Sequence, residues 1–254
     1  MNKEELKKKM GMNTESKAHI YKLNQVQMSG DNGMFSLSDL LKERPKGEKV
    51  MKHDLGSELD GVILKMRWML SRYDEPSKTF FKSSEYDDKW NDEVTIYPAK
   101  ERGSVEAMKE KYKLPTQRIV YMYVPSQKEK VRLIVKSSAL TGKGKNPNDE
   151  LGLFEYLNEF SNTDSLPCQF ITSCTGVFRA GKNDDGSPNK RKDHYAMTFK
   201  TGRQLTESEF EKVEAMIDEV NKNTASKPII DEETEDENGA PGAISEDDIG
   251  EIPF

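Results

Sequence analysis

The residues from Arg118 to Lys136 carry the clearest β-hairpin pattern in this chain of 254 residues. Apolar and polar side chains alternate on both sides of a central turn, and such alternation puts one set of side chains on each face of a strand. The apolar face is formed by Val120, Met122, Val124, Val131, Leu133 and Val135. The pattern therefore predicts two antiparallel strands that cover a core, and it requires a fold built around a sheet.

The opposite face of this hairpin carries Tyr121, Tyr123, Arg132 and Lys136. Tyrosine rings beside cations can stack on unpaired bases and neutralise the phosphates that join them. A second interpretation is that another layer of the protein covers this face and buries the rings as core, because aromatic residues are common in strands. The sequence leaves both interpretations open.

Further strands and helices are expected on both sides of the hairpin. Residues 62–72 alternate in the same way, with Lys65, Arg67 and Tyr73 on the polar face. We expect Thr79–Ser83 to return as the second arm of a hairpin, and residues 169–179 to pair with 193–200. Helices are expected at 36–41, 104–112, 149–160 and 206–221, the second beginning at Ser104 and the last with a Thr206/Glu209 capping box.

The charge of the chain is divided unevenly between its body and its last residues. Residues 228–254 contain ten acids and no Lys or Arg, which leaves 35 acids against 39 Lys and Arg, or +4, in the rest. A run of acids with few apolar side chains cannot offset the entropy lost on ordering, so we expect this tail to be disordered. Its last residues, Ile252, Pro253 and Phe254, are apolar and suit a pocket on a partner better than a purely solubilising role.

The ending Glu251–Phe254, preceded by the acids Glu246–Asp248, resembles the acidic tip of bacterial single-stranded DNA-binding proteins and their phage counterparts. The likeness covers about the last nine residues and departs at Ile249 and Gly250, which interrupt the acidic run. It implies a tip that recruits replication and repair proteins and competes with DNA for the body. That role would fall on Asp247, Asp248, Glu251, Ile252, Pro253 and Phe254.

Together, the order of elements and the resemblance favour a mixed β protein with helices (α+β), namely an elaborated OB-fold-like β-barrel with a disordered acidic C-terminal tail. We expect an N-terminal arm and peripheral segment (1–60), an OB-like nucleic-acid-binding core (61–223) and a partner-binding tail (224–254). The basic residues 2–11 are a candidate for self-association along DNA, as the resemblance implies.

The leading hypothesis is a sequence-independent single-stranded DNA-binding protein that coats and protects the strand in replication, recombination and repair. We expect no catalysis, no cofactor and no metal site. The candidate DNA contacts are Tyr121, Tyr123, Arg132, Lys136, Lys65, Arg67, Tyr73, Trp90, Lys143, Lys145, Lys190, Arg191 and Lys192.

Two alternatives belong to other functional classes. The body can instead bind protein or duplex DNA as a replication or recombination adaptor, or acid pairs such as Asp87 and Asp88 can hold magnesium in a nuclease. The two cysteines, Cys168 and Cys174, fit a reducing compartment, and no apolar run reaches the length of a membrane span. We therefore expect a protein of the cytoplasm of a bacterium or a phage-infected cell that does not bind membranes.

Overall fold

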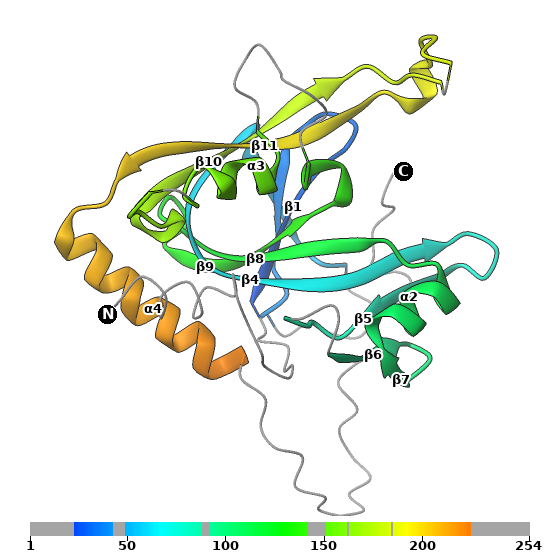
Figure 1. The fold of residues 1–254 in the computed structure, drawn as a ribbon, viewed down its shortest axis with the longest axis horizontal. Coiled ribbons are helices and arrows are strands. Elements are labelled where there is room, and N and C mark those ends of the chain that lie inside the picture. Colours follow the sequence, from blue (N-terminus) through cyan, green and yellow to red (C-terminus); the bar gives the residue numbers. More distant parts are fainter. Residues whose placement is uncertain are drawn as a thin grey trace, which may run out of the picture.

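The long strand β4 (Glu58–Asp74) connects the three parts of the fold (Figure 1). The computed structural model describes residues 23–42, 49–87, 92–141, 151–161, 163–183 and 185–224. The first residues of β4 pair with β10 (Phe170–Arg179), and its last residues pair with β5 (Thr79–Ser83). Its middle pairs with β8 (Thr116–Val124), in a register that shifts between Ile63 and Lys65. An irregularity of this kind bends a strand, which allows one strand to serve several sheets.

Strands β4, β8 and β9 (Glu129–Val135) form an antiparallel meander. Val120 lies opposite Leu133, Met122 lies opposite Val131, and all four side chains are fully buried. The hairpin predicted over residues 118–136 is therefore confirmed, and its apolar face lies in the main core.

The sheet continues beyond β9 through the N-terminal strands. β1 (Asn24–Met28) runs parallel to β9, and β2 (Phe35–Ser38) and β3 (Lys52–Gly56) follow as antiparallel neighbours. Val26 and Phe35 are fully buried in the main core. Strands β1 and β2, which belong to the segment expected to be peripheral, therefore contribute to the same core as the central hairpin.

The short helix predicted over residues 36–41 is wrong, because the chain forms β2 there. Phe35 and Leu37 are buried while Ser36 and Ser38 are half-buried, which is the alternation of a strand. Serine can cap a helix, but here pairing with both β1 and β3 supplies the backbone hydrogen bonds.

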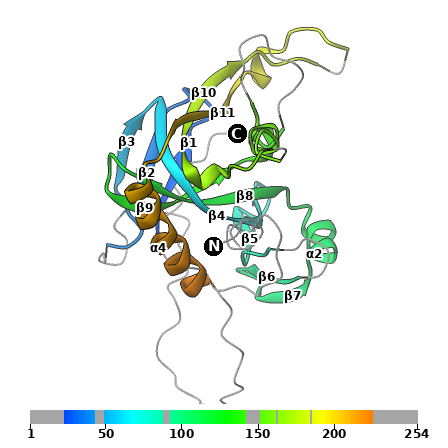
Figure 2. The same cartoon turned by 60° about the vertical axis from the view of Figure 1, so that its left-hand side comes forward.

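A helix and a second hairpin follow β9. Helix α3 (Leu153–Asn158) precedes β10, which pairs antiparallel with β11 (His194–Gln204) as predicted. Residues 172–175 of β10 also pair with residues 58–61 of β4. The connectivity is thus a three-stranded meander, a helix, and a two-stranded hairpin whose first strand returns to the first strand of the meander (Figures 1 and 2). Single 3-10 turns lie at Ser137–Ala139, Pro167–Gln169 and Lys190–Lys192.

Helix α4 (Glu207–Thr224) ends the described chain and packs on the main core. The predicted capping box is present, because the backbone N–H of Glu209 donates to the Thr206 hydroxyl and the backbone N–H of Thr206 donates to the Glu209 carboxylate. Val213 and Ile217 are buried on the helical stripe that the sequence pattern indicates.

A smaller unit is inserted between β4 and β8. It contains β5, β6 (Glu93–Tyr97), β7 (Glu101–Ser104) and α2 (Val105–Tyr112), and the Ser104 hydroxyl caps α2 as predicted. This insertion has a core of its own, formed by Leu70, Tyr86, Val94, Ile96, Val105, Met108 and Leu114. The protein as described is a mixed α+β structure with one large, mostly antiparallel sheet.

Candidate nucleic-acid interface

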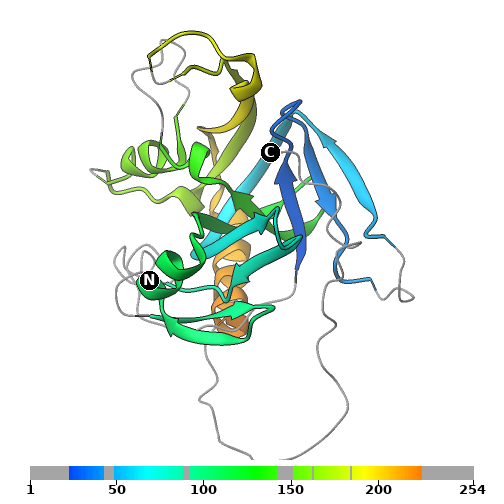
Figure 3. The ribbon, with the colours of Figure 1, turned by 90° about the vertical axis from the view of Figure 1, so that its right-hand side faces the viewer.

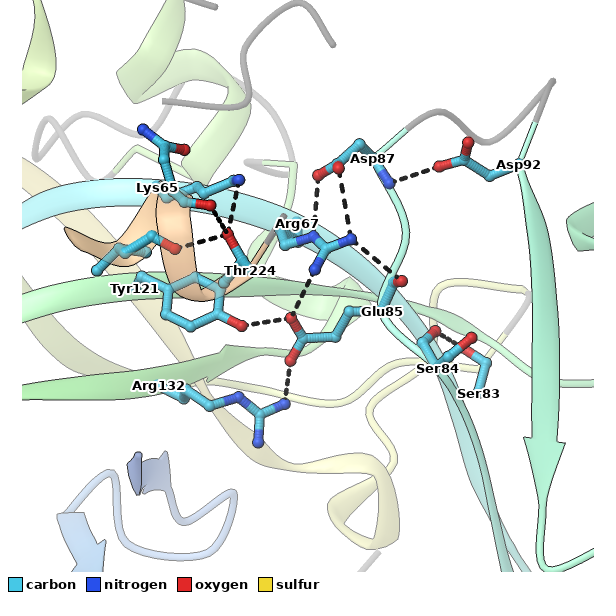
Figure 4. A network of polar contacts seen from close by, with 12 residues as sticks. Lys65, Arg67, Ser83, Ser84, Glu85, Asp87, Asp92, Tyr121, Arg132 and Thr224 are labelled. Atoms are coloured by element: carbon cyan, nitrogen blue, oxygen red, sulfur yellow. Dashed lines mark hydrogen bonds and ion pairs between the residues drawn. The ribbon is translucent and has the colours of Figure 1, made fainter. Parts of the chain in front are cut away.

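A buried polar network lies on the face of β4, β8 and β9 opposite the face that carries Val120, Met122 and Leu133 (Figure 4). The Arg67 Nε donates to Asp87 Oδ1 at 2.9 Å, and both side chains are fully buried. Arg67 Nη2 also donates to the backbone carbonyl of Glu85 at 3.3 Å. The guanidinium therefore ties the segment that follows β5 to the middle of β4.

Glu85 connects the three strands of the meander to the same segment. Its carboxylate accepts hydrogen bonds from the Tyr121 hydroxyl, at 2.5 Å, and from the Arg132 guanidinium. Burial, followed by the charge of Glu85, raises the pKa of Tyr121. Tyr121 is therefore a hydrogen-bond donor within the protein, and its ring is fully covered.

Lys65 extends the network to the last residue of α4. Its Nζ donates to Thr224 Oγ1 at 2.8 Å, and only 4% of the residue is exposed. Burial lowers the pKa of Lys65 to about 8, with a further lowering from the Arg67 charge, against the opposing effects of Asp87 and Glu85. Burial thus makes the charged form of Lys65 unfavourable at the point where α4 ends.

The network changes the interpretation of four predicted DNA contacts. Lys65, Arg67, Tyr121 and Arg132 share one sheet face, as the alternation predicted, but each is buried. The segment around residue 85 and helix α4 cover this face, so the second interpretation of the hairpin applies to Tyr121. Sequence alternation locates a face but cannot tell what covers it.

The other predicted contacts are distributed over several places. Tyr73, Tyr123 and Lys136 are half-buried, whereas Lys190, Arg191 and Lys192 are exposed. Asp87, half of the acid pair considered for magnesium, is engaged by Arg67. Trp90, Lys143, Lys145, Asp88, the basic residues 2–11 and the tip residues Asp247, Asp248, Glu251, Ile252, Pro253 and Phe254 lie outside the described residues.

The exposed cations belong to an extended hairpin, which we term the arm (described residues 176–183 and 185–197). The pairing of β10 with β4 ends at Thr175, whereas its pairing with β11 continues to Arg179. The arm therefore continues beyond the part of β10 that pairs with β4 (Figure 1). The Asn189 side chain caps the 3-10 turn Lys190–Lys192, so these three cations belong to a turn with a defined backbone conformation.

Two aromatic residues lie on the arm between its base and these cations. Phe178 is 52% exposed, and its ring meets that of Tyr195 edge-on, with 5.6 Å between centroids. By alternation both belong to the face that carries the core residues Cys174 and Phe199 farther along the hairpin. The strand face that packs into the core at Cys174 and Phe199 therefore extends beyond the core, and Phe178 and Tyr195 lie on that extension. The sequence reasoning predicted the strands but missed this pair, although the same alternation identifies it.

The base of the arm packs against the turn between β1 and β2. The Tyr195 backbone N–H donates to the Gly30 carbonyl at 2.7 Å. A Cβ on Gly176 would lie 2.4 Å from the Gly33 carbonyl oxygen, and Gly33 itself has a φ of +71° against the Tyr195 ring. Glycine at both positions permits this close contact, which sets the direction of the arm.

A second aromatic and cationic cluster joins α3 to the meander. The Arg118 guanidinium lies over the Trp68 ring, 4.2 Å from its centroid, and Trp68 contacts Phe154 of α3 with 6.0 Å between centroids. Phe154 is 38% exposed, and burial lowers the pKa of Arg118 to about 10. In Figure 3, α3 lies between the arm above and the inserted unit below, so this cluster occupies the region between the two.

Comparisons with protein-family models, curated proteins and solved structures found no match for this chain. None of the helices within the described ranges is long and apolar enough to cross a membrane. The same ranges hold no group of three or more His, Cys, Asp and Glu side chains arranged to bind a metal ion.

Proposed function

We propose that this protein binds single-stranded DNA without sequence preference, through the arm and the surface beside α3. The observation that carries the proposal is that one hairpin holds the exposed ring of Phe178 and, at its end, an ordered turn of three exposed cations. Bases of any sequence can stack on an aromatic ring, and cations along the same path neutralise the phosphates. The arm offers both groups on one hairpin.

The connectivity of the central strands supports the assignment of an OB-like barrel. In an OB-fold a three-stranded meander is followed by a helix and by a hairpin that closes on the first strand. The order β4, β8, β9, α3, β10 and β11, with β10 paired to β4, follows that plan. The loop between the last two strands of such barrels takes part in oligonucleotide binding, and in this chain that loop is the arm.

The Trp68, Arg118 and Phe154 cluster is the second part of the proposed interface. Phe154 offers an exposed ring, whereas Arg118 is buried and packs on the Trp68 ring that contacts Phe154, so we assign Arg118 to positioning these rings. A strand that leaves the arm toward α3 would meet this second stacking position. We assign the buried network around Glu85 a different role, which is to fix the inserted unit against the meander.

We further propose that the protein coats DNA in replication, recombination and repair, in the cytoplasm of a bacterium or an infected cell. This rests on the acidic tip, whose likeness to single-stranded DNA-binding proteins supports recruitment of partner proteins through Ile252–Phe254. Self-association through residues 2–11 belongs to the same proposal. An adaptor for protein or duplex DNA remains the alternative.

The test is a titration of the full chain with a labelled single-stranded oligonucleotide and with the matching duplex, across a range of salt concentrations. We expect a clear preference for the single strand and an affinity that falls steeply as salt rises, because phosphate contacts release counterions. Equal or tighter binding of the duplex would favour the adaptor, and magnesium-dependent cleavage of either substrate would favour a nuclease.

A further inference from the structure

The sheet of the inserted unit has one covered face. Helix α2 contributes Val105 and Met108 to the core of this unit, where they join Val94 and Ile96 of β6. The core therefore lies between the helix and one face of the strands (Figure 2). When one face of an antiparallel sheet is covered in this way, the other face ordinarily carries polar side chains. The second face of the strands β4, β5 and β6 departs from that rule.

Three aromatic rings and a lysine lie on that second face. Tyr73 of β4 is opposite Phe80 of β5, and Lys82 of β5 is opposite Tyr97 of β6. Directly opposite residues share a face, and Phe80 and Lys82 share one because they are two residues apart on one strand. Ile96, the neighbour of Tyr97 in sequence, is fully buried on the core face. We term Tyr73, Phe80, Lys82 and Tyr97 the aromatic face of the inserted unit.

The three rings lie outside the two hydrophobic cores of the described residues. Tyr97 is 38% exposed, and Tyr73 and Phe80 are half-buried. Accessible aromatic side chains that gather on one surface are typical of a binding site rather than of a solvated sheet face. The pairing of β4, β5 and β6 holds their backbone in place, which lowers the entropy lost when a ligand covers the rings.

The cation on the aromatic face indicates the charge of the ligand. Lys82 is half-buried, and burial lowers its pKa. The positive charge of Arg132 lowers the pKa of Lys82 further, although the Arg132 guanidinium already donates to the Glu85 carboxylate. The amine of Lys82 thus lies in positive surroundings, where an added anion would be attracted. A ligand that suits this face combines flat apolar rings with negative charge.

We propose that the aromatic face is a second binding surface for single-stranded DNA. Bases stack on Phe80 and Tyr97, and a phosphate between them meets Lys82. A nucleic-acid strand carries a negative charge beside every ring, which is the combination that this face requires. The proposal takes its ligand from the proposed function, but it uses side chains outside the arm and α3.

The aromatic face and the first proposed interface lie on opposite faces of β4. Trp68, which contacts Phe154 of α3, shares one face of the strand with Leu70, whereas Tyr73 shares the other face with Ser71. A long strand that passes around the sheet can engage both surfaces. Its affinity then gains from the effective concentration of the second contact, which a short oligonucleotide lacks.

The test is photo-cross-linking of the full chain to an oligothymidine that carries the photoreactive base 4-thiothymine, with the linked residues identified by mass spectrometry. We expect cross-links on the arm and, on the aromatic face, at Tyr73, Phe80 or Tyr97. Cross-links on the arm alone would overturn this proposal and leave the proposed function standing. Cross-links on the aromatic face alone would support it and exclude the arm, and the absence of any cross-link would overturn both.

Substitutions test the chemistry of the contact. Tyr97→Ala removes an exposed ring and should raise the Kd for a long oligothymidine about fivefold or more, whereas Tyr97→Trp should retain the affinity. Lys82→Met keeps the apolar part of the side chain and should reduce the slope of log K against log salt by about 1. Lys109→Met alters an exposed lysine of α2, on the covered side of the same unit, and should change neither quantity.

Two results of these measurements would contradict the proposal. The first is a Kd and a salt slope equal to those of the parent protein in both Tyr97→Ala and Lys82→Met. The second is self-association of the parent protein that Tyr97→Ala abolishes in analytical ultracentrifugation while the Kd for the oligothymidine stays unchanged. That result would assign the aromatic face to a second copy of the chain.

Discussion

Arg67 and Asp87 form an ion pair in which both side chains are fully buried, with 2.9 Å between Nε and Oδ1. Asp87→Ala removes the shorter of two ion pairs of the buried Arg67, whose pair with Glu85 is 3.8 Å long, so it should lower the free energy of unfolding by about 3–5 kcal/mol. Urea unfolding measures this decrease. Glu93→Ala is the control. The side chains of Glu93 and its partner Arg102 are both exposed, so this ion pair should contribute little to the free energy of unfolding. Equal decreases in the two variants would contradict a structural role for the buried pair.

Lys65 should make the stability of the protein depend on pH. Burial lowers its pKa to about 8 from the ordinary 10.5, so between these values the unfolded chain binds a proton that the folded protein has lost. Stability due to this group therefore rises as the pH increases from about 8 toward 10, by an amount on the order of 1–3 kcal/mol. Lys65→Met removes this group, so the stability of the parent protein relative to the variant should rise across that pH range in urea unfolding experiments. The same slope in both proteins would show that another group titrates.

Phe178→Ala should weaken single-stranded DNA binding while leaving the fold intact. Loss of one stacked base costs about 1–3 kcal/mol, which corresponds to roughly a 5- to 150-fold higher Kd. Because Phe178 is half exposed, the free energy of unfolding should change little. Fluorescence anisotropy gives the Kd, and thermal unfolding checks the fold.

Tyr121→Phe is the matched aromatic control for Phe178→Ala. It removes a buried hydroxyl that donates to Glu85 and should lower the free energy of unfolding by about 1–3 kcal/mol. Its Kd for single-stranded DNA should not change, because the ring is covered. A large change in Kd for Tyr121→Phe without one for Phe178→Ala would show that DNA binds to the face of β4, β8 and β9 that carries Tyr121, and not to the arm.

The cations at the end of the arm should determine the salt dependence of binding. Replacing Lys190, Arg191 and Lys192 by alanine should reduce the slope of log K against log salt by up to about 3, roughly one for each phosphate that the variant no longer neutralises. Lys109→Ala, an exposed cation on α2, should leave the slope unchanged. Titrations at several salt concentrations measure both slopes. Identical slopes in the triple variant and the parent protein would show that these cations do not contact the DNA phosphates.

The direction of the arm should matter for binding independently of its side chains. Gly176→Ala forces a Cβ into the Gly33 backbone, so the base of the arm must move. We expect lower stability and weaker single-stranded DNA binding although no side chain of the proposed interface is altered. Gly30→Ala is the control, because a Cβ at Gly30 meets no atom within 4 Å. Equal effects of the two substitutions would argue against a positioning role for the close approach of Gly176 to Gly33.

Much of the secondary structure followed from the sequence because its signals are local. Alternating side chains predicted β8 and β9, and the hydroxyls of Ser104 and Thr206 marked the starts of α2 and α4. The helix expected over residues 36–41 failed for a non-local reason. Strand pairing with β1 and β3, from other parts of the chain, decided the conformation there.

The sequence by itself determined which side chains share a strand face, because alternation is a property of the backbone alone. It also determined the opposition between a basic body and an acidic tail. Only the tertiary structure decided which face is covered: Glu85 and Thr224, distant in sequence, bury Tyr121 and Lys65, while Phe178 continues past the core into solvent. Exposure depends on what packs against a residue, and that is set by contacts between segments far apart in the chain.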